Sequence, residues 1–202
     1  MEQKALARGQ FVVALALIER GTVTIGAIGC PRLGLTGVEG VPEEPGGVAV
    51  AVRGRGAWWT PLSGGSPVRL RVSENRNPAE ARIADSVETA HSDRSRQQAM
   101  LQALACRAAP VLMDSQAKHV AVAAGMADVL VRFPRPGYRE AIWDQAAGTI
   151  LIEEAGGRVS DLSGRPFDFS TGRRLTQNEG VLATNGLVHD AVLSAVGGGS
   201  TA

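Results

Sequence analysis

The order of the apolar runs along the chain constrains its fold more than any other feature. In the first third, apolar runs follow one another directly, over residues 11–18, 22–29 and 46–52, and glycine turns follow the first and the third. Residues 59–62 and 68–72 add shorter runs. Apolar runs of this length, separated by turns, are typical of strands joined by hairpins. The first third is therefore predicted to form an antiparallel sheet.

The pattern changes at about residue 75, where the composition turns polar. Beyond this point strands are expected over 82–87, 111–113, 129–131, 158–161 and 180–184, and helices over 93–106, 116–125, 143–155 and 187–196. Alternation of strand and helix is typical of an α/β domain. The sequence therefore predicts an α/β protein with an antiparallel-sheet domain over residues 1–75, an α/β domain over 76–196 and a flexible tail over 197–202.

Composition limits what the whole surface attracts. The 21 Lys and Arg residues against 20 Asp and Glu give a formal net charge of +1, so no broad attraction to nucleic acid or to an anionic membrane is expected. Cys30 and Cys106 have neither metal-ligand spacing nor the density of a disulfide scaffold. No apolar run approaches the ~20 residues that span a bilayer, and the first residues do not open a signal peptide. We expect a protein of the reducing cytosol.

Asp144 is the first candidate for chemistry, because it falls in the first turn of the helix predicted over 143–155. A carboxylate in that position is commonly a cap or a partner of the helix dipole. It can also project into a cleft and bridge a magnesium ion to a phosphate, with the small residues Ala146, Ala147 and Gly148 allowing close packing of the helix. Spacing alone does not decide between these interpretations.

Other polar residues also have two interpretations. Ser115 and Lys118 are three residues apart at a predicted helix start, where hydroxyl, ammonium and free backbone N–H groups favour an anion. The alternative is a capping serine followed by a solvated lysine. His91 and Ser92 form either a polar turn or part of an anion pocket.

The remaining conspicuous residues favour structural roles. Trp58 and Trp59 are predicted to pack in the core from an edge strand, in preference to a base-stacking platform. The pair Arg173–Arg174 is interpreted as solvated, and Thr184–Asn185 as a turn.

Two segments carry a resemblance to a known family. The pattern Trp-Asp-x-Ala-Ala-Gly over residues 143–148, followed by Glu-Ala-Gly-Gly over 154–157, resembles the carboxy-terminal signature of the inositol-monophosphatase superfamily. Further segments are similar to its 3'(2'),5'-bisphosphate nucleotidase branch, over residues 10–17, 28–31, 85–92, 113–118 and 136–144. The resemblance covers nearly the whole chain, roughly residues 4–196.

The resemblance implies a layered α/β sandwich and a magnesium-dependent phosphatase. Enzymes of this branch remove the 3'-phosphate from 3'-phosphoadenosine 5'-phosphate or its sulfated form with a metal-activated water. The matching metal ligand is Asp144. The residues that the resemblance assigns to the substrate are His91, Ser92, Ser115, Lys118, Arg132 and Tyr138, and the ring of Tyr138 would suit stacking on adenine.

The chain also departs from the family pattern. Relatives carry a glutamate pair and an Asp-Pro-x-Asp-Gly-Thr motif before the point that matches Lys4, so residues 1–75 are expected to be the remnant of a larger sheet domain. With Asp144 as the single ligand, activity is expected to be impaired, and no residue is assigned to direct catalysis. His119 and Gln145 replace the tyrosine and histidine that are usual in this branch.

Three expectations accompany this assignment. An inositol or sugar monophosphatase and a non-catalytic nucleotide-binding fragment stay open as alternatives. The expected partner is a small nucleotide bisphosphate, with no nucleic acid and no membrane. Exposed apolar surface and an unpaired strand edge over residues 11–28 further predict aggregation or a homodimer.

Overall fold

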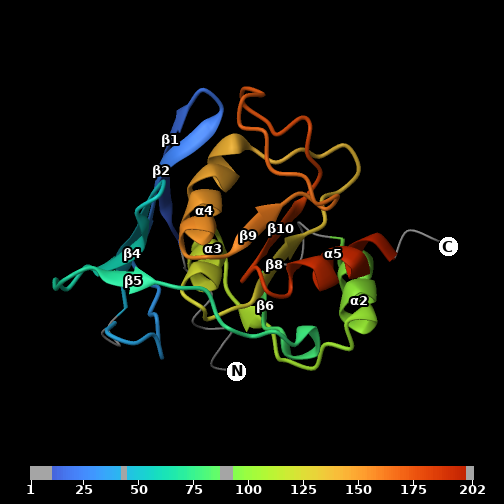
Figure 1. The fold of residues 1–202 in the computed structure, drawn as a ribbon, viewed down its shortest axis with the longest axis horizontal. Helices are drawn as coiled ribbons and strands as arrows, with labels where there is room; N and C mark the ends of the chain where they lie inside the picture. Colours follow the sequence, from blue (N-terminus) through green and yellow to red (C-terminus); the bar gives the residue numbers. More distant parts are fainter. Residues whose placement is uncertain (1–10, 42–44, 87–92, 199–202) are drawn as a thin grey trace.

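The fold contains two five-stranded sheets, seen in a computed structural model that describes residues 11–41, 45–86 and 93–198 (Figure 1). The first sheet has its strands in sequence order, and every neighbouring pair is antiparallel. Its strands are β1 (Val13–Glu19), β2 (Thr22–Cys30), β3 (Gly47–Val52), β4 (Gly56–Pro61) and β5 (Val68–Leu70). The predicted antiparallel sheet is confirmed.

The first hairpin illustrates how local sequence sets this sheet. Arg20 and Gly21 connect β1 to β2 with φ angles of 51° and 78°. Positive φ at both central residues is the turn geometry that matches the twist of two antiparallel strands. A bulge between Leu17 and Ile18 shifts the register next to this turn.

The second sheet is mixed, with the strand order β7-β6-β8-β10-β9. Its strands are β6 (Ile83–Asp85), β7 (Val111–Leu112), β8 (Val129–Arg132), β9 (Arg158–Ser160) and β10 (Val181–Thr184). β6 runs parallel to both β7 and β8, whereas β10 is antiparallel to β8 and β9. The carboxyl ends of β6, β7 and β8 therefore lie along one edge.

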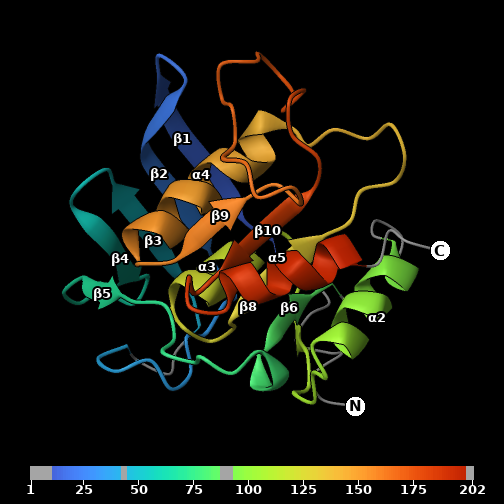
Figure 2. The same ribbon diagram turned by 45° about the vertical axis from the view of Figure 1, so that its right-hand side comes forward.

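Helices separate and cover the two sheets. They are the 3-10 turn η1 (Pro78–Glu80), α2 (Arg94–Ala103), α3 (Ala117–Ala123), α4 (Ile142–Glu154) and α5 (His189–Gly198). In both ribbon views α3 and α4 lie between the sheets, and α2 and α5 cover the outer face of the second sheet (Figures 1 and 2). The architecture is an α/β layered fold, as the sequence predicts.

Two apolar cores follow from these layers. The larger core joins the first sheet, α3, α4 and one face of the second sheet, and the smaller core lies between the second sheet, α2 and α5. Neighbouring residues of β8 alternate between them, with Leu130 in the larger core and Val131 in the smaller. A sheet buried on both faces reads as a continuous apolar run, which is why β8 was recognisable in the sequence.

Small residues let α4 approach the first sheet closely. A Cβ atom on Gly26 of β2 would lie 2.5 Å from Ile150 Cγ2 and 2.9 Å from the carbonyl oxygen of Ala147. On the other side of the helix, a Cβ atom on Gly148 would lie 2.2 Å from the ring of His119 in α3. Glycine at both positions therefore fixes the depth at which α4 sits between the two layers.

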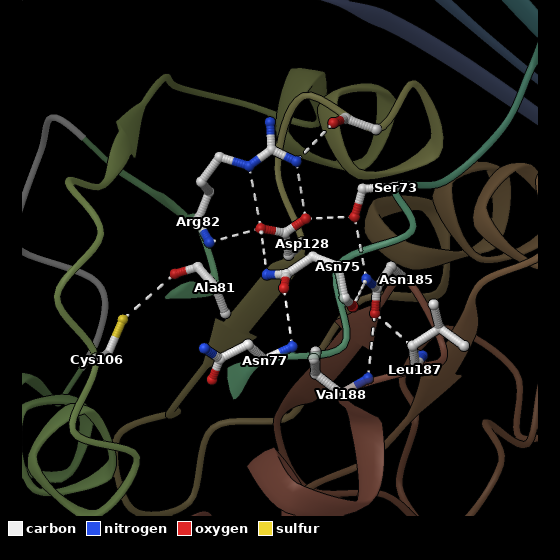
Figure 3. A network of polar contacts seen from close by, with 11 residues as sticks. Ser73, Asn75, Asn77, Ala81, Arg82, Cys106, Asp128, Asn185, Leu187 and Val188 are labelled. Atoms are coloured by element: carbon white, nitrogen blue, oxygen red, sulfur yellow. Dashed lines mark hydrogen bonds and ion pairs between the residues drawn. The ribbon is translucent and has the colours of Figure 1, made fainter. Parts of the chain in front are cut away.

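A buried carboxylate network closes the edge of the second sheet opposite to the carboxyl ends of β6 and β8 (Figure 3). Asp128, which is fully buried, precedes β8 and accepts hydrogen bonds from the backbone nitrogen, Nε and Nη2 of Arg82 at 2.7–3.0 Å. Ser73 Oγ and Asn75 Nδ2 also donate to it. Asn185 donates from its side chain to Ser73 Oγ and from its backbone to Asp128, which adds the end of β10 to the network.

Three details of the sequence interpretation were wrong or incomplete. β4 pairs with both β3 and β5, so it is not an edge strand. Trp59 is buried, as expected, but Trp58 points to the outer face, where it is 37% exposed and lies 5.7 Å beneath the guanidinium of Arg69. Asn185 is also more than part of a turn, because its side chain belongs to the Asp128 network.

The division into domains at residue 75 stays a prediction. The proposed boundary falls in the segment between β5 and η1. No helix in residues 11–41, 45–86 and 93–198 is long and apolar enough to cross a membrane.

Strand β1 leads us to expect self-association. It ends the described sheet, and Val13, Leu15 and Leu17 on its outer face are 60%, 69% and 47% exposed. An unpaired strand edge with apolar side chains favours pairing with another copy. Sedimentation should show a concentration-dependent dimer or larger species that Leu15→Lys shifts towards monomer. Leu62→Lys, at an exposed position outside the strands, should leave it unchanged. A monomer at all concentrations contradicts the expectation.

Candidate active site

The polar residues that follow the three parallel strands meet at one edge of the second sheet. Asp85 ends β6, Asp114 follows β7 and Arg132 ends β8. Ligand sites in α/β sheets commonly lie outside the carboxyl ends of parallel strands, where the loops diverge. The first turn of α4, which contains Asp144, lies beside this edge, since Gln116, two residues after Asp114, donates a hydrogen bond to Asp144 Oδ1.

Lys118 brings a largely buried ammonium group to this edge. Its Nζ donates a hydrogen bond to Ser86 Oγ, directly after β6. Burial lowers the pKa of Lys118, the positive charge of Arg132 lowers it further, and the carboxylates of Asp114 and Asp85 oppose the shift. Lys118 and Arg132 thus place two cationic side chains within electrostatic range of each other.

Ser115 has a different environment from Lys118. It lies in the turn before α3 with φ at 61°, is exposed, and its Oγ accepts a 3.5 Å hydrogen bond from the backbone nitrogen of Ala117. The residue that precedes the helix is Gln116, and it makes no side-chain capping bond. Ser115 and Lys118 therefore do not share a helical face, although their spacing suggested it.

Asp144 lies half-buried in the first turn of α4, as predicted. Gln116 Nε2 donates to Asp144 Oδ1 and to the carbonyl oxygen of Trp143, both at 3.4 Å. Because the amide nitrogen of Gln116 faces two acceptors, the amide oxygen, Oε1, points away from them. This oxygen is buried and accepts no hydrogen bond from any described residue. The carboxylate of Asp144 is a ligand type that suits magnesium, which prefers oxygen ligands.

A line of buried polar side chains leads from Arg132 into the protein. Arg132 Nε lies 3.2 Å from Oε1 of Glu140, whose other oxygen accepts a 3.1 Å hydrogen bond from Gln145 Nε2. Gln145 Oε1 in turn lies 3.2 Å from His119 Nε2. Burial raises the pKa of Glu140, while Arg132 and the Gln145 bond act in the opposite direction.

Tyr138 lies on the solvent side of this line. The guanidinium of Arg132 is 5.3 Å from the centroid of its ring, and that of Arg174 is 5.9 Å away. Arg174 also lies 5.8 Å from the ring of Trp143 and donates to the carbonyl oxygen of Arg139. Arg174 is therefore held against aromatic rings, so the interpretation of Arg173–Arg174 as a merely solvated pair was incomplete.

The buried imidazole of His119 predicts an acid-sensitive fold. Burial lowers its pKa to about 4 from an ordinary value of 6.5. Between these two pH values the unfolded chain binds a proton that the folded chain does not, so the free energy of unfolding must decrease as the pH falls. Each pKa unit corresponds to about 1.4 kcal/mol, so the loss is of the order of 3 kcal/mol.

Urea denaturation between pH 7 and pH 4.5 measures this loss. His119→Gln should be less stable at pH 7 but lose stability less steeply with acid. His189, whose pKa burial also lowers to about 4, contributes the remaining dependence. An unchanged slope in His119→Gln would exclude His119 as the acid-sensitive group.

Several residues at this edge were not predicted as site residues. They are Gln116, Glu140 and the carboxylates Asp85 and Asp114, which come together only when three strands and α4 are assembled. The predicted pair His91 and Ser92 lies outside the described residues. In the described part of the chain, no group of three or more His, Cys, Asp or Glu side chains is arranged to hold a metal ion.

The sequence model of the "Inositol monophosphatase family" matches residues 6–196. This chain belongs to the inositol monophosphatase family.

Individual relatives of known name were also compared with this chain. The chain is 40% identical over 199 residues to a "3'(2'),5'-bisphosphate nucleotidase" of Oryza sativa, a match that covers 96% of this chain and 56% of the relative. It is 39% identical over 208 residues to "3'(2'),5'-bisphosphate nucleotidase 2" of Candida albicans, covering 96% and 58%. The chain thus spans somewhat more than half the length of these relatives.

Solved structures agree on the fold. An IMPase of Thermotoga maritima is 26% identical with a TM-score of 0.67, and the match covers 93% of this chain and 61% of that one. An inositol monophosphatase of Anabaena is 23% identical with a TM-score of 0.62, covering 93% and 64%. The layered fold predicted from the sequence is confirmed.

Proposed function

We propose that this chain carries the nucleotide-binding edge of a magnesium-dependent phosphatase that removes the 3'-phosphate of 3'-phosphoadenosine 5'-phosphate or its sulfated form. The observation that carries the proposal is the convergence of Lys118, Arg132 and Asp144 on one edge of the second sheet. The names of the curated relatives support the nucleotide substrate. A cytosolic location is part of the same proposal.

Asp144, half-buried in the first turn of α4, would hold the magnesium ion. When bound, the ion neutralises charge on the phosphoryl group and lowers the pKa of a water molecule that attacks it. Magnesium usually keeps several waters and binds one or two carboxylates together with substrate phosphate oxygens. Asp144 supplies one such carboxylate, and with Asp144 as the single assigned ligand the activity of this chain is proposed to be impaired.

The chain's own cations would bind and orient the substrate. Lys118 presents a compact charge and Arg132 a planar guanidinium, which can bind two oxygens of one phosphate at once. The partly exposed ring of Tyr138, next to Arg132, offers a surface on which adenine can stack. In the proposed complex, His91 and Ser92 contact the second phosphate, and Ser115 contributes its exposed hydroxyl.

A second candidate is a nucleotide-binding protein without turnover. It is favoured by the finding that the described residues bring fewer than three metal-ligating side chains together. The cations Lys118 and Arg132 would then still bind phosphate. An inositol or sugar monophosphatase is the alternative within the same chemistry.

Phosphate release and calorimetry separate these functions. The 202-residue chain is incubated with 3'-phosphoadenosine 5'-phosphate, adenosine 5'-monophosphate or inositol 1-phosphate, with magnesium or with EDTA. The proposal expects magnesium-dependent release from the bisphosphate and slower release from the two monophosphates. Binding of the bisphosphate without release and without magnesium dependence supports the second candidate. Preferred hydrolysis of inositol 1-phosphate supports the alternative phosphatase.

A further inference from the structure

We propose that Glu140 is a positioning residue, whose buried carboxylate holds the Nε side of Arg132 so that the two terminal nitrogens face a substrate phosphate. This inference rests on the proposed function. It adds a residue that neither the sequence pattern nor the likeness to relatives assigns, and it begins from the geometry of the Arg132 side chain.

Arg132 is restrained on two sides. Its Nε forms an ion pair with Glu140 Oε1 at 3.2 Å, a contact that lacks hydrogen-bond alignment, and its guanidinium lies 5.3 Å from the centroid of the Tyr138 ring. Within the described residues, its Nη1 and Nη2 form no hydrogen bond. When a guanidinium is restrained at Nε, its two terminal nitrogens remain available as donors. These nitrogens can donate two parallel hydrogen bonds to one phosphate.

Glu140 is itself held too firmly to be an incidental partner. Its side chain is only 2% exposed. Its backbone oxygen accepts a 2.9 Å bond from the nitrogen of Leu175, and two residues further on the nitrogen of Ile142 donates to the carbonyl oxygen of Arg173 at 3.2 Å. The segment around residue 174 therefore fixes the backbone from which the carboxylate projects.

A second pair of side chains fixes the orientation of the carboxylate. Because an ionised carboxylate only accepts, the amide nitrogen of Gln145 must face Glu140 Oε2. The amide oxygen then faces His119, which must carry its proton on Nε2 to donate to it. His119 Nδ1 is buried and makes no hydrogen bond among the described residues, so Gln145 is the side chain that aligns the imidazole.

The result is a connected series from the core to the site, in the order His119, Gln145, Glu140 and Arg132. A carboxylate buried at this depth is retained only when it is paired, since desolvation of the charge is otherwise unfavourable. Among the described residues the ion-pair partner of Glu140 is Arg132, the arginine that the proposed function assigns to phosphate. Glu140 therefore fixes the position of the Arg132 guanidinium in the free protein. This lowers the conformational entropy that the side chain loses when substrate binds.

Glu140→Gln tests the role because it keeps the size of the side chain and removes its charge. Calorimetry with adenosine 3',5'-bisphosphate should show about tenfold weaker binding, as expected when one charge-assisted contact is lost. In an Arg132→Lys background the same substitution should change affinity by less than about twofold, because residues that act as a unit are not additive. Glu153→Gln, which removes an exposed carboxylate paired with Arg53 at the other end of α4, is the matched control and should bind like the unaltered chain.

A readout without ligand separates this inference from the proposed function. In NMR spectra the rotation of the Arg132 guanidinium should be slow in the unaltered chain and in Glu153→Gln, and faster in Glu140→Gln, because the ion pair restrains the side chain. Equal binding by Glu140→Gln and the unaltered chain overturns the inference and leaves the proposed function standing, and so does an equal loss of affinity in both backgrounds. Failure of the unaltered chain to bind the bisphosphate overturns the proposed function and this role with it, even where slow rotation of the guanidinium shows that Glu140 restrains Arg132.

Discussion

Replacing Asp144 by asparagine should lower magnesium-dependent release of phosphate by about a hundredfold or more. Loss of groups that merely support a metal ligand already costs about 10–100-fold in affinity or activity, and Asp144 is the proposed ligand itself. Asparagine keeps the shape of the side chain but loses the charge that attracts the cation. Because Asp144 is half-buried in the first turn of α4 and, among the described residues, accepts a long bond of 3.4 Å from Gln116 alone, the fold should tolerate the change.

The measurement needs two controls. Asp190→Asn removes a carboxylate whose side chain is 86% exposed and which pairs with Arg158, so it should retain full activity. Thermal unfolding of Asp144→Asn in EDTA should resemble that of the unaltered chain, whereas the stabilisation caused by added magnesium should disappear. Full activity in Asp144→Asn would remove Asp144 from the proposed metal site.

The sequence predicted the succession of elements well because burial leaves a periodic signal. β8 and β10 are buried on both faces, so each reads as a short apolar run. α4 combines buried residues at helical spacing with Gly156–Gly157 behind it, and the predicted helix over 143–155 is displaced by one residue from the observed Ile142–Glu154. Both signals are local, and they needed no knowledge of the partners.

The arrangement of the polar side chains could be predicted less well from the sequence. Glu140 and Gln116 are ordinary polar residues in sequence, and their contacts with Arg132 and Asp144 join segments that meet only in three dimensions. Ser115 was expected to share a helical face with Lys118, but its left-handed backbone places it before the helix. Spacing rules apply within an element, and the candidate site lies between elements.

The two edges of the second sheet have different tasks. The carboxyl ends of β6 and β8 carry Asp85 and Arg132, whose charges remain partly accessible. The opposite edge carries Arg82 and Asp128, which neutralise each other around a fully buried carboxylate (Figure 3). A polar network in which every group is paired is rigid. We call the Asp128 network the rigid base of the sheet, because it can stabilise the strands whose other ends carry the charged side chains of the candidate site.

Asp128→Asn should therefore destabilise the chain without involving the candidate site directly. Burial raises the pKa of Asp128, but the bonds from Arg82 and Ser73 outweigh this and hold the pKa below its ordinary value. The ionised form is thus favoured by folding, and stability should fall as the pH drops through the folded-state pKa. In Asp128→Asn an amide nitrogen replaces one carboxylate oxygen, so a donor faces the donor groups of Arg82. The guanidinium also loses its counter-charge.

Breaking a buried pair from one side typically costs about 3–5 kcal/mol, and the partial exposure of Arg82 favours the lower end, about 3 kcal/mol. Urea denaturation at pH 7 measures the difference. Asp190→Asn, which breaks an exposed ion pair, should cost less than about 1 kcal/mol. If both variants lose equally little, the Asp128 network contributes no more than a surface ion pair, and the rigid base inferred for this edge does not exist.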